Sequence, residues 1–192
     1  LAWLNIVCAN KFKYDANIAQ TKEKELDRVL SRPALQLNTA ATPSTSQGGF
    51  VDPFAGCVPV TTNSRFFFES WWLIGNYHFD YDSSKYSVET AISAYRKLVD
   101  DPTHRFYDKG LYKLAWSYFK ADRYPEAIAA FSRVVDYSDA QSDNRGAGMR
   151  PEAIQYLAVS FFTEDWNVDS IPDEPGGFVR LQDPKLMPQD RK

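Results

Sequence analysis

The chain has 192 residues, of which 44% are hydrophobic and 24% are charged, and its formal net charge is −3. This length and composition predict one soluble domain. The negative charge argues against a nucleic-acid-binding protein, because neutralising phosphates requires a basic face. No run of about 18 apolar residues occurs, so no membrane-spanning segment is predicted. The chain begins with Leu1 rather than Met, which leaves open a lipid anchor upstream.

Residues 1–31 are predicted to form one long N-terminal helix. They contain neither Gly nor Pro, and their second half consists mostly of good helix formers. Leu26, Val29 and Leu30 recur at the i, i+3, i+4 spacing of an apolar helix stripe. Pro33 is expected to end the helix.

Residues 32–62 are predicted to be a loop segment with two different parts. Residues 40–49 are small, polar and glycine-rich, and such a composition does not bury enough apolar surface to hold one shape. Residues 50–59 combine aromatic side chains with prolines, so we expect this part to pack on the body of the protein.

The only two cysteines are Cys8 and Cys57. They are either two separate thiols or one disulfide that attaches the loop to the N-terminal helix, and the sequence leaves both readings open. A disulfide implies an oxidising compartment such as a periplasm.

Residues 63–165 are predicted to be helical. Phe67, Trp71, Ile74 and His78 recur at 4-3-4 spacing, which favours a helix over the strand that so many aromatic residues could also form. The predicted helices cover residues 65–79, 86–100, 104–121, 124–137 and 151–164. Prolines recur in residues 166–192 and predict an irregular, extended C-terminal tail.

The helices form pairs that repeat along the chain. Ala127, Phe131 and Val134 reproduce the spacing of Ala91, Tyr95 and Leu98. This pattern resembles the tetratricopeptide repeat, a helix-turn-helix unit of about 34 residues. The unit at 108–141 matches best, because it keeps the family's signature positions at Leu114, Ala115, Tyr118, Tyr124, Ala127 and Phe131, although the family's terminal proline is absent.

Two further units are partial. The unit at 68–102 keeps Trp71, Ile74, Gly75, Ala91, Tyr95 and Pro102, and the unit at 151–165 keeps only its first helix. The resemblance implies an all-α fold, namely a short right-handed superhelix of such repeats. The N-terminal segment is expected to cap this array.

In the family, the first helices of successive repeats line a concave groove. The resemblance therefore implies a partner-binding groove lined by Glu69, Trp72, Asn76, Phe79, Asp80, Lys109, Tyr112, Trp116, Phe119, Lys120, Glu152, Gln155, Val159 and Phe162. Aromatic side chains there suit peptide binding. The alternative is that Trp72, Trp116 and Phe119 are covered by the N-terminal helix or by the loop at 50–59.

The resemblance implies a non-enzymatic scaffold or adaptor for protein–protein interaction. The alternative is a structural subunit of a large assembly whose groove is filled by its own chain, such as residues 171–188. The chain is also similar to tetratricopeptide scaffolds and lipoproteins of the Gram-negative envelope. That similarity implies a periplasmic or outer-membrane-associated multiprotein complex; otherwise the expected location is cytoplasmic.

No cofactor and no metal are predicted. The two histidines, His78 and His104, have no convergent partners in register, so structural roles are expected for both. The sequence has no phosphate-binding loop, dinucleotide fingerprint or nucleophile elbow.

Overall fold

The computed structural model describes residues 1–31, 50–60, 64–81, 87–143, 146–163 and 165. Within these ranges the chain is all-helical and has no strand, which confirms the predicted helical-repeat fold. The predicted loop at 40–49 and the tail at 166–192 lie outside the described residues. The elements are α1 (Ala2–Val7), α2 (Ala16–Leu30), α3 (Phe67–Asn76), η1 (Tyr77–Tyr81), α4 (Ser87–Leu98), α5 (Tyr107–Lys120), α6 (Tyr124–Ala140) and α7 (Arg150–Phe162).

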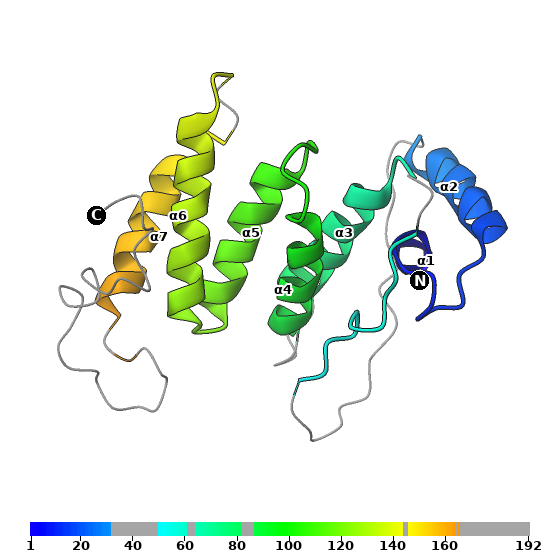
Figure 1. The fold of residues 1–192 in the computed structure, drawn as a ribbon, viewed down its shortest axis with the longest axis horizontal. Helices are drawn as coiled ribbons and strands as arrows, with labels where there is room; N and C mark the ends of the chain where they lie inside the picture. Colours follow the sequence, from blue (N-terminus) through cyan, green and yellow to red (C-terminus); the bar gives the residue numbers. More distant parts are fainter. Residues whose placement is uncertain (32–49, 61–63, 82–86, 144–145, 164, 166–192) are drawn as a thin grey trace.

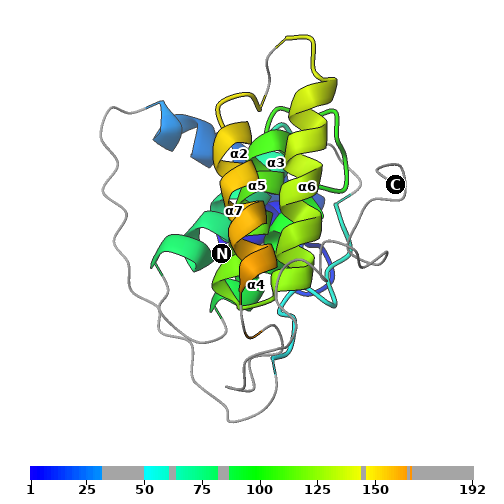
Figure 2. The ribbon, with the colours of Figure 1, turned by 90° about the vertical axis from the view of Figure 1, so that its left-hand side faces the viewer.

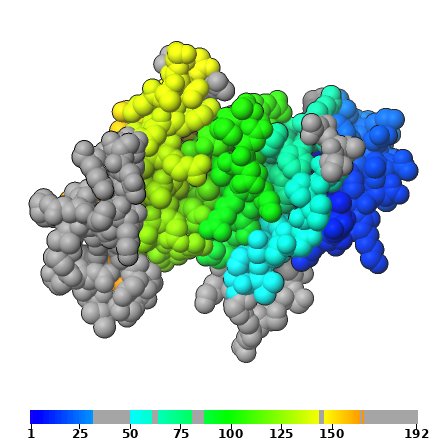
Figure 3. Space-filling model, in the orientation of Figure 1, coloured from blue at the N-terminus to red at the C-terminus, as the bar shows by residue number. Residues whose placement is uncertain are grey.

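The helices stand side by side in one row (Figures 1 and 2). From α3 to α7 each helix packs on the next in chain order, while α1 packs on α3 and α2 packs on α1. Figure 3 shows the same succession as one continuous surface, from the N-terminal end in blue to α6 in yellow. Among the helices just listed, none is long and apolar enough to cross a membrane.

The N-terminal segment is two helices rather than the single helix predicted for 1–31. The chain breaks between Val7 and Ala16, where Lys13 adopts a left-handed backbone with φ of 50°. Asp15 then caps α2, because its Oδ1 accepts a hydrogen bond from the Asn17 amide at 2.7 Å. One helix can therefore end and another begin in a segment without Gly or Pro, where a residue such as Asp15 caps the N-terminus of the second helix.

The loop at 50–60 packs on the N-terminal end of the row, as predicted for residues 50–59. A disulfide joins Cys57 to the fully buried Cys8 at the end of α1. Phe54 is only 2% exposed, and its ring meets Trp71 of α3 edge-on at 5.2 Å between centroids. The loop is therefore attached to the row by a covalent bond and by a buried aromatic contact.

Close packing between the repeat helices depends on two glycines. A Cβ at Gly75 would lie 2.5 Å from the Tyr95 ring, and one at Gly110 would lie 2.6 Å from the Leu98 side chain. The α3–α4 and α4–α5 crossings therefore require a residue without a side chain. The Tyr95 hydroxyl also donates a hydrogen bond to Oδ1 of Asn76 at 2.7 Å. Asn76, which was predicted to line the groove, therefore joins α3 to α4.

The end of the helix predicted for 65–79 has an unusual geometry. After Asn76 the α-helix continues as the π-helical turn η1, which extends to Tyr81. Such turns insert one extra residue per turn and are frequent at functional sites. Here η1 brings Phe79 opposite α5.

Candidate functional site

A cavity of about 580 Å³ opens between η1 and one face of α5. It is lined by Phe79, Tyr112, Lys113, Trp116, Phe119, Lys120 and Asp122. The α5 residues at positions 112, 116, 119 and 120 share one helix face because they are three or four residues apart. The structure thus gathers around one cavity several groove residues that the sequence predicted from different repeat units.

Two lysines of α5 hold the Phe79 ring. Nζ of Lys113 lies 4.2 Å and Nζ of Lys120 lies 4.8 Å from the ring centroid, within cation–π range. Lys120 also donates to the Phe79 carbonyl at 3.1 Å, and Lys113 pairs with Asp80 at 3.4 Å. Phe79 is therefore held both through its ring and through its backbone.

Sequence reasoning missed Lys113 as a site residue. Its seven-residue distance from Lys120 places both side chains on the same side of α5, and this spacing could have identified it. What the spacing alone does not reveal is the π-helical turn that brings Phe79 between the two ammonium groups.

The cover over the α5 aromatics comes from α7. The Tyr156 ring lies 4.1 Å from Trp116 and 5.3 Å from Phe119, between centroids. Trp116 and Phe119 remain half-buried. The sequence analysis left open a cover by the N-terminal helix or by the loop at 50–59. In the structure, Tyr156 of α7, the first helix of the third repeat unit, packs on both rings.

Predicted groove residues of α3 take part in contacts within the row. The Trp72 ring stacks on Phe106 at 6.0 Å, and the Glu69 carboxylate pairs with Arg105 at 3.2 Å. These contacts join α3 to the turn before α5. The structure therefore places Glu69 and Trp72 outside the cavity lining.

The α7 residues of the predicted groove are exposed. Gln155 and Glu152 face solvent, while Val159 is 44% and Phe162 is 66% exposed. Burial, followed by a hydrogen bond to the Glu152 carboxylate, raises the pKa of Tyr112 to about 12. The neutral Tyr112 hydroxyl therefore connects α5 to α7 at the edge of the cavity. Lys109, in the first turn of α5, is also exposed.

His104 has a structural role, as expected. Its Nδ1 accepts a hydrogen bond from the Phe106 amide at 3.0 Å, so its Nε2 carries the proton and donates to the Leu98 carbonyl at 2.6 Å. The ring also stacks on Phe68 at 3.9 Å. These bonds hold the turn between α4 and α5. Within the described part of the chain, no group of three or more His, Cys, Asp or Glu side chains could hold a metal ion.

The comparison with protein families agrees with this geometry. Residues 109–138 match the family model described as Tetratricopeptide repeat. The matched segment covers most of α5 and α6, which is the unit that the sequence pattern identified as the best formed. No curated protein and no solved structure matches the chain. The chain thus contains one segment, residues 109–138, that matches the tetratricopeptide repeat.

Proposed function

We propose that this protein is a non-enzymatic scaffold that binds a peptide or protein segment in the groove between η1 and α5. Tetratricopeptide repeats suggest a protein–protein interaction scaffold. The observation that carries the proposal is the cavity of about 580 Å³ on the first helix of the matched repeat. A space of this volume is within the range of pockets that enclose small ligands or side chains.

The chemistry of the lining suits a peptide. Tyr112, Trp116 and Phe119 present large aromatic surfaces that lose little conformational entropy on binding. Lys113 and Lys120 add hydrogen-bond donors beside them, and both are within reach of a peptide lying over Phe79. The groove therefore offers an apolar floor for one side chain and polar groups at its edge.

The test is affinity capture from the native source with two groove variants. Phe79→Ala removes the ring held by the lysines, and Lys120→Glu reverses a charge at the cavity edge. Both should lose the partner that the parent protein captures, with an unchanged helical circular dichroism spectrum.

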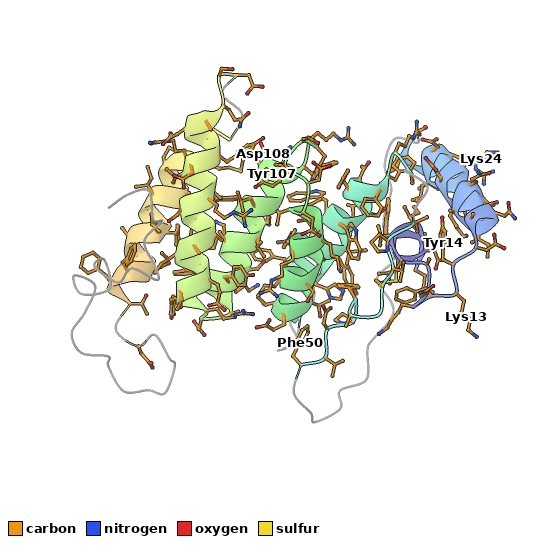
Figure 4. All side chains as sticks on the ribbon, in the orientation of Figure 1. Lys13, Tyr14, Lys24, Phe50, Tyr107 and Asp108 are labelled. Carbon is orange, nitrogen blue, oxygen red and sulfur yellow. A yellow bond between two sulfur atoms is a disulfide. The ribbon has the colours of Figure 1, made fainter. Side chains whose placement is uncertain are left out.

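Lys24→Glu is the matched control. Lys24 is exposed on α2, at the N-terminal end of the row and away from α5 (Figure 4), so its charge reversal should leave capture intact. Equal capture by the parent, both groove variants and the control would contradict the groove.

We also propose that the scaffold acts in an oxidising compartment, as part of a periplasmic or outer-membrane-associated complex of the bacterial envelope. The Cys8–Cys57 disulfide supports this location, because such bonds persist where thiols are not kept reduced. A thiol count on protein isolated without reductant tests it. The proposal requires no reactive thiol before reduction and two afterwards, whereas two reactive thiols at the start would contradict it.

A further inference from the structure

The helix α7 carries an apolar stripe on the flank that faces away from α5. Ile154, Ala158 and Phe162 follow one another at four-residue spacing, so they lie along one side of the helix. Ile154 is 41% and Phe162 is 66% exposed, and Ala158 is exposed as well. The opposite flank is already occupied, because it carries Tyr156, which packs on Trp116.

This stripe is unusual for the last helix of a row. A terminal helix of a repeat array needs a polar outer face to stay in solution. A helix that is apolar on both flanks is instead typical of one that is covered on both. Among the described residues α7 packs on α6, as the last helix at its end of the row (Figures 1 and 2). Its outer flank therefore has the composition of an interface.

A second copy of the chain is a poor occupant for this flank. The helix has 13 residues, which corresponds to a length of about 20 Å. Pairing two such short stripes buries less than the roughly 1,200 Å² at which specific interfaces begin. A free partner would therefore bind weakly through this flank alone.

The chain that follows α7 does not meet this difficulty. Residues 166–192 are tethered to the end of α7, and a tether gives an effective concentration in the millimolar range even for a weak contact. Residues 176–183 contain no proline and include the apolar Phe178, Val179 and Leu181. Residues 166–177 can span up to about 3.3 Å each, which is enough to run back along the whole of α7.

We propose that residues 178–181 bind in an extended form over Ile154, Ala158 and Phe162 and so cap the last helix of the row. Prolines at 172, 175 and 184 prevent this segment from extending into a second helix like α4 or α6. On this flank the segment covers α7, as α4 covers α3 and α6 covers α5. It lies on the outer flank and leaves the groove over Phe79 accessible.

The direct test is photo-cross-linking in the full-length chain. A photoreactive amino acid replaces Phe162, and mass spectrometry of an equal mixture of light and heavy isotope-labelled protein identifies the attached peptide. The proposal requires cross-links within one chain to a peptide containing residues 178–181. Cross-links between light and heavy chains would identify a second copy as the occupant and overturn the proposal.

The matched control places the same amino acid at Ile18, which is also apolar and partly exposed but lies on α2 at the other end of the row. It should give no cross-link to residues 178–181. Equal yields from both positions, or no cross-link from position 162, would also overturn the proposal.

A coupling measurement gives an independent check. If Phe162 and Phe178 touch, the shifts in the urea midpoint caused by Phe162→Ser and Phe178→Ser are not additive in the double variant. The double variant should unfold near the midpoint of the less stable single variant. Val51 is an exposed side chain of the loop at 50–60. The midpoint shift caused by Val51→Ser should therefore add fully to the shift caused by Phe178→Ser. Full additivity of the Phe162 and Phe178 changes would contradict the contact.

Discussion

The two ends of the helix row are built differently. At the N-terminal end, Gln20, Lys24 and Arg28 follow one another at four-residue spacing on the exposed face of α2. At the C-terminal end, the exposed flank of α7 carries the apolar Ile154 and Phe162, which are two four-residue steps apart. α2 therefore presents a mostly polar outer face of the kind that a capping helix needs, although Ile18 near its start and Leu30 at its end are also exposed. The outer flank of α7 is mostly apolar.

The N-terminal cap is also attached by a covalent bond. The disulfide joins α1 to the loop at 50–60, and Arg65 just before α3 pairs with Asp27 of α2. At the other end α7 is joined to α6 by Arg150, which makes two hydrogen bonds to Asp139 at 2.5 and 3.1 Å. Both ion pairs are exposed, so each contributes little to stability. Among the described residues, therefore, only the N-terminal end of the row is held by a covalent bond.

The largest expected effect comes from removing the aromatic anchor of the N-terminal cap. Phe54→Ala deletes a buried ring that packs edge-on against Trp71, so it should cost about 3–5 kcal/mol in the free energy of unfolding. Urea denaturation followed by circular dichroism measures the loss. Val51→Ala in the same loop is the control. Its side chain is 80% exposed, so its effect should stay within about 0.5 kcal/mol. Equal effects of the two changes would show that the loop is not packed on α3.

Opening the disulfide should have the next largest effect. Cys8 and Cys57 are 49 residues apart, and a bond closing a loop of that length stabilises by about 2–4 kcal/mol. The double variant Cys8→Ser with Cys57→Ser should lose this amount and become sensitive to proteolysis between residues 50 and 60. Reductant should destabilise the parent equally and leave the double variant unchanged. A parent protein indifferent to reductant would contradict a stabilising role.

The middle of the row should respond to a single added methyl group. Gly75→Ala forces a Cβ against the buried Tyr95 ring, and such overpacking costs about 1–3 kcal/mol. Gly148→Ala is the control, because no atom lies within 4 Å of the added Cβ. The thermal midpoints of the two variants should differ clearly, and matching midpoints would show that α3 and α4 can separate without cost.

Local patterns in the sequence predicted much of this fold. The 4-3 spacing of Phe67, Trp71 and Ile74 correctly indicated a helix rich in aromatic residues. Pro125 lies in the first turn of α6, where its missing N–H costs nothing. These signals depend only on neighbouring residues, so they are readable before the fold is known.

The remaining features either have no recognisable local signal or depend on contacts between distant segments. The break before α2 follows from the left-handed backbone of Lys13, which is not a residue type that marks such a turn. The role of Lys113 follows from η1, and the cover on Trp116 comes from Tyr156 in another repeat unit. The repeat pattern could place residues on a helix face, but it could not indicate which neighbouring side chains would occupy that face.

The smallest expected effect concerns the connection between α5 and α7 at the C-terminal end of the row. Tyr112 donates to Glu152, and Tyr112→Phe should cost only about 0.5–1 kcal/mol at pH 7, because a single partly exposed hydrogen bond is lost. An unfolded tyrosine has a pKa near 10, whereas that of Tyr112 in the folded chain is raised to about 12. Its contribution to stability is therefore complete below pH 10 and is lost as the pH rises towards 12.

Urea unfolding at pH 7 and again between pH 10 and 12 tests this connection. The parent should lose more stability over the alkaline range than Tyr112→Phe, because the variant has no phenol to ionise at that position. Glu152→Gln keeps a hydrogen-bond acceptor and removes the carboxylate charge. It should therefore reduce the loss of stability between pH 10 and 12 while changing stability little at pH 7. If the stability of the parent and of Tyr112→Phe changes with pH in the same way, α7 is held to α5 by ring packing alone. The C-terminal end of the row would then have one polar connection fewer than the structure indicates.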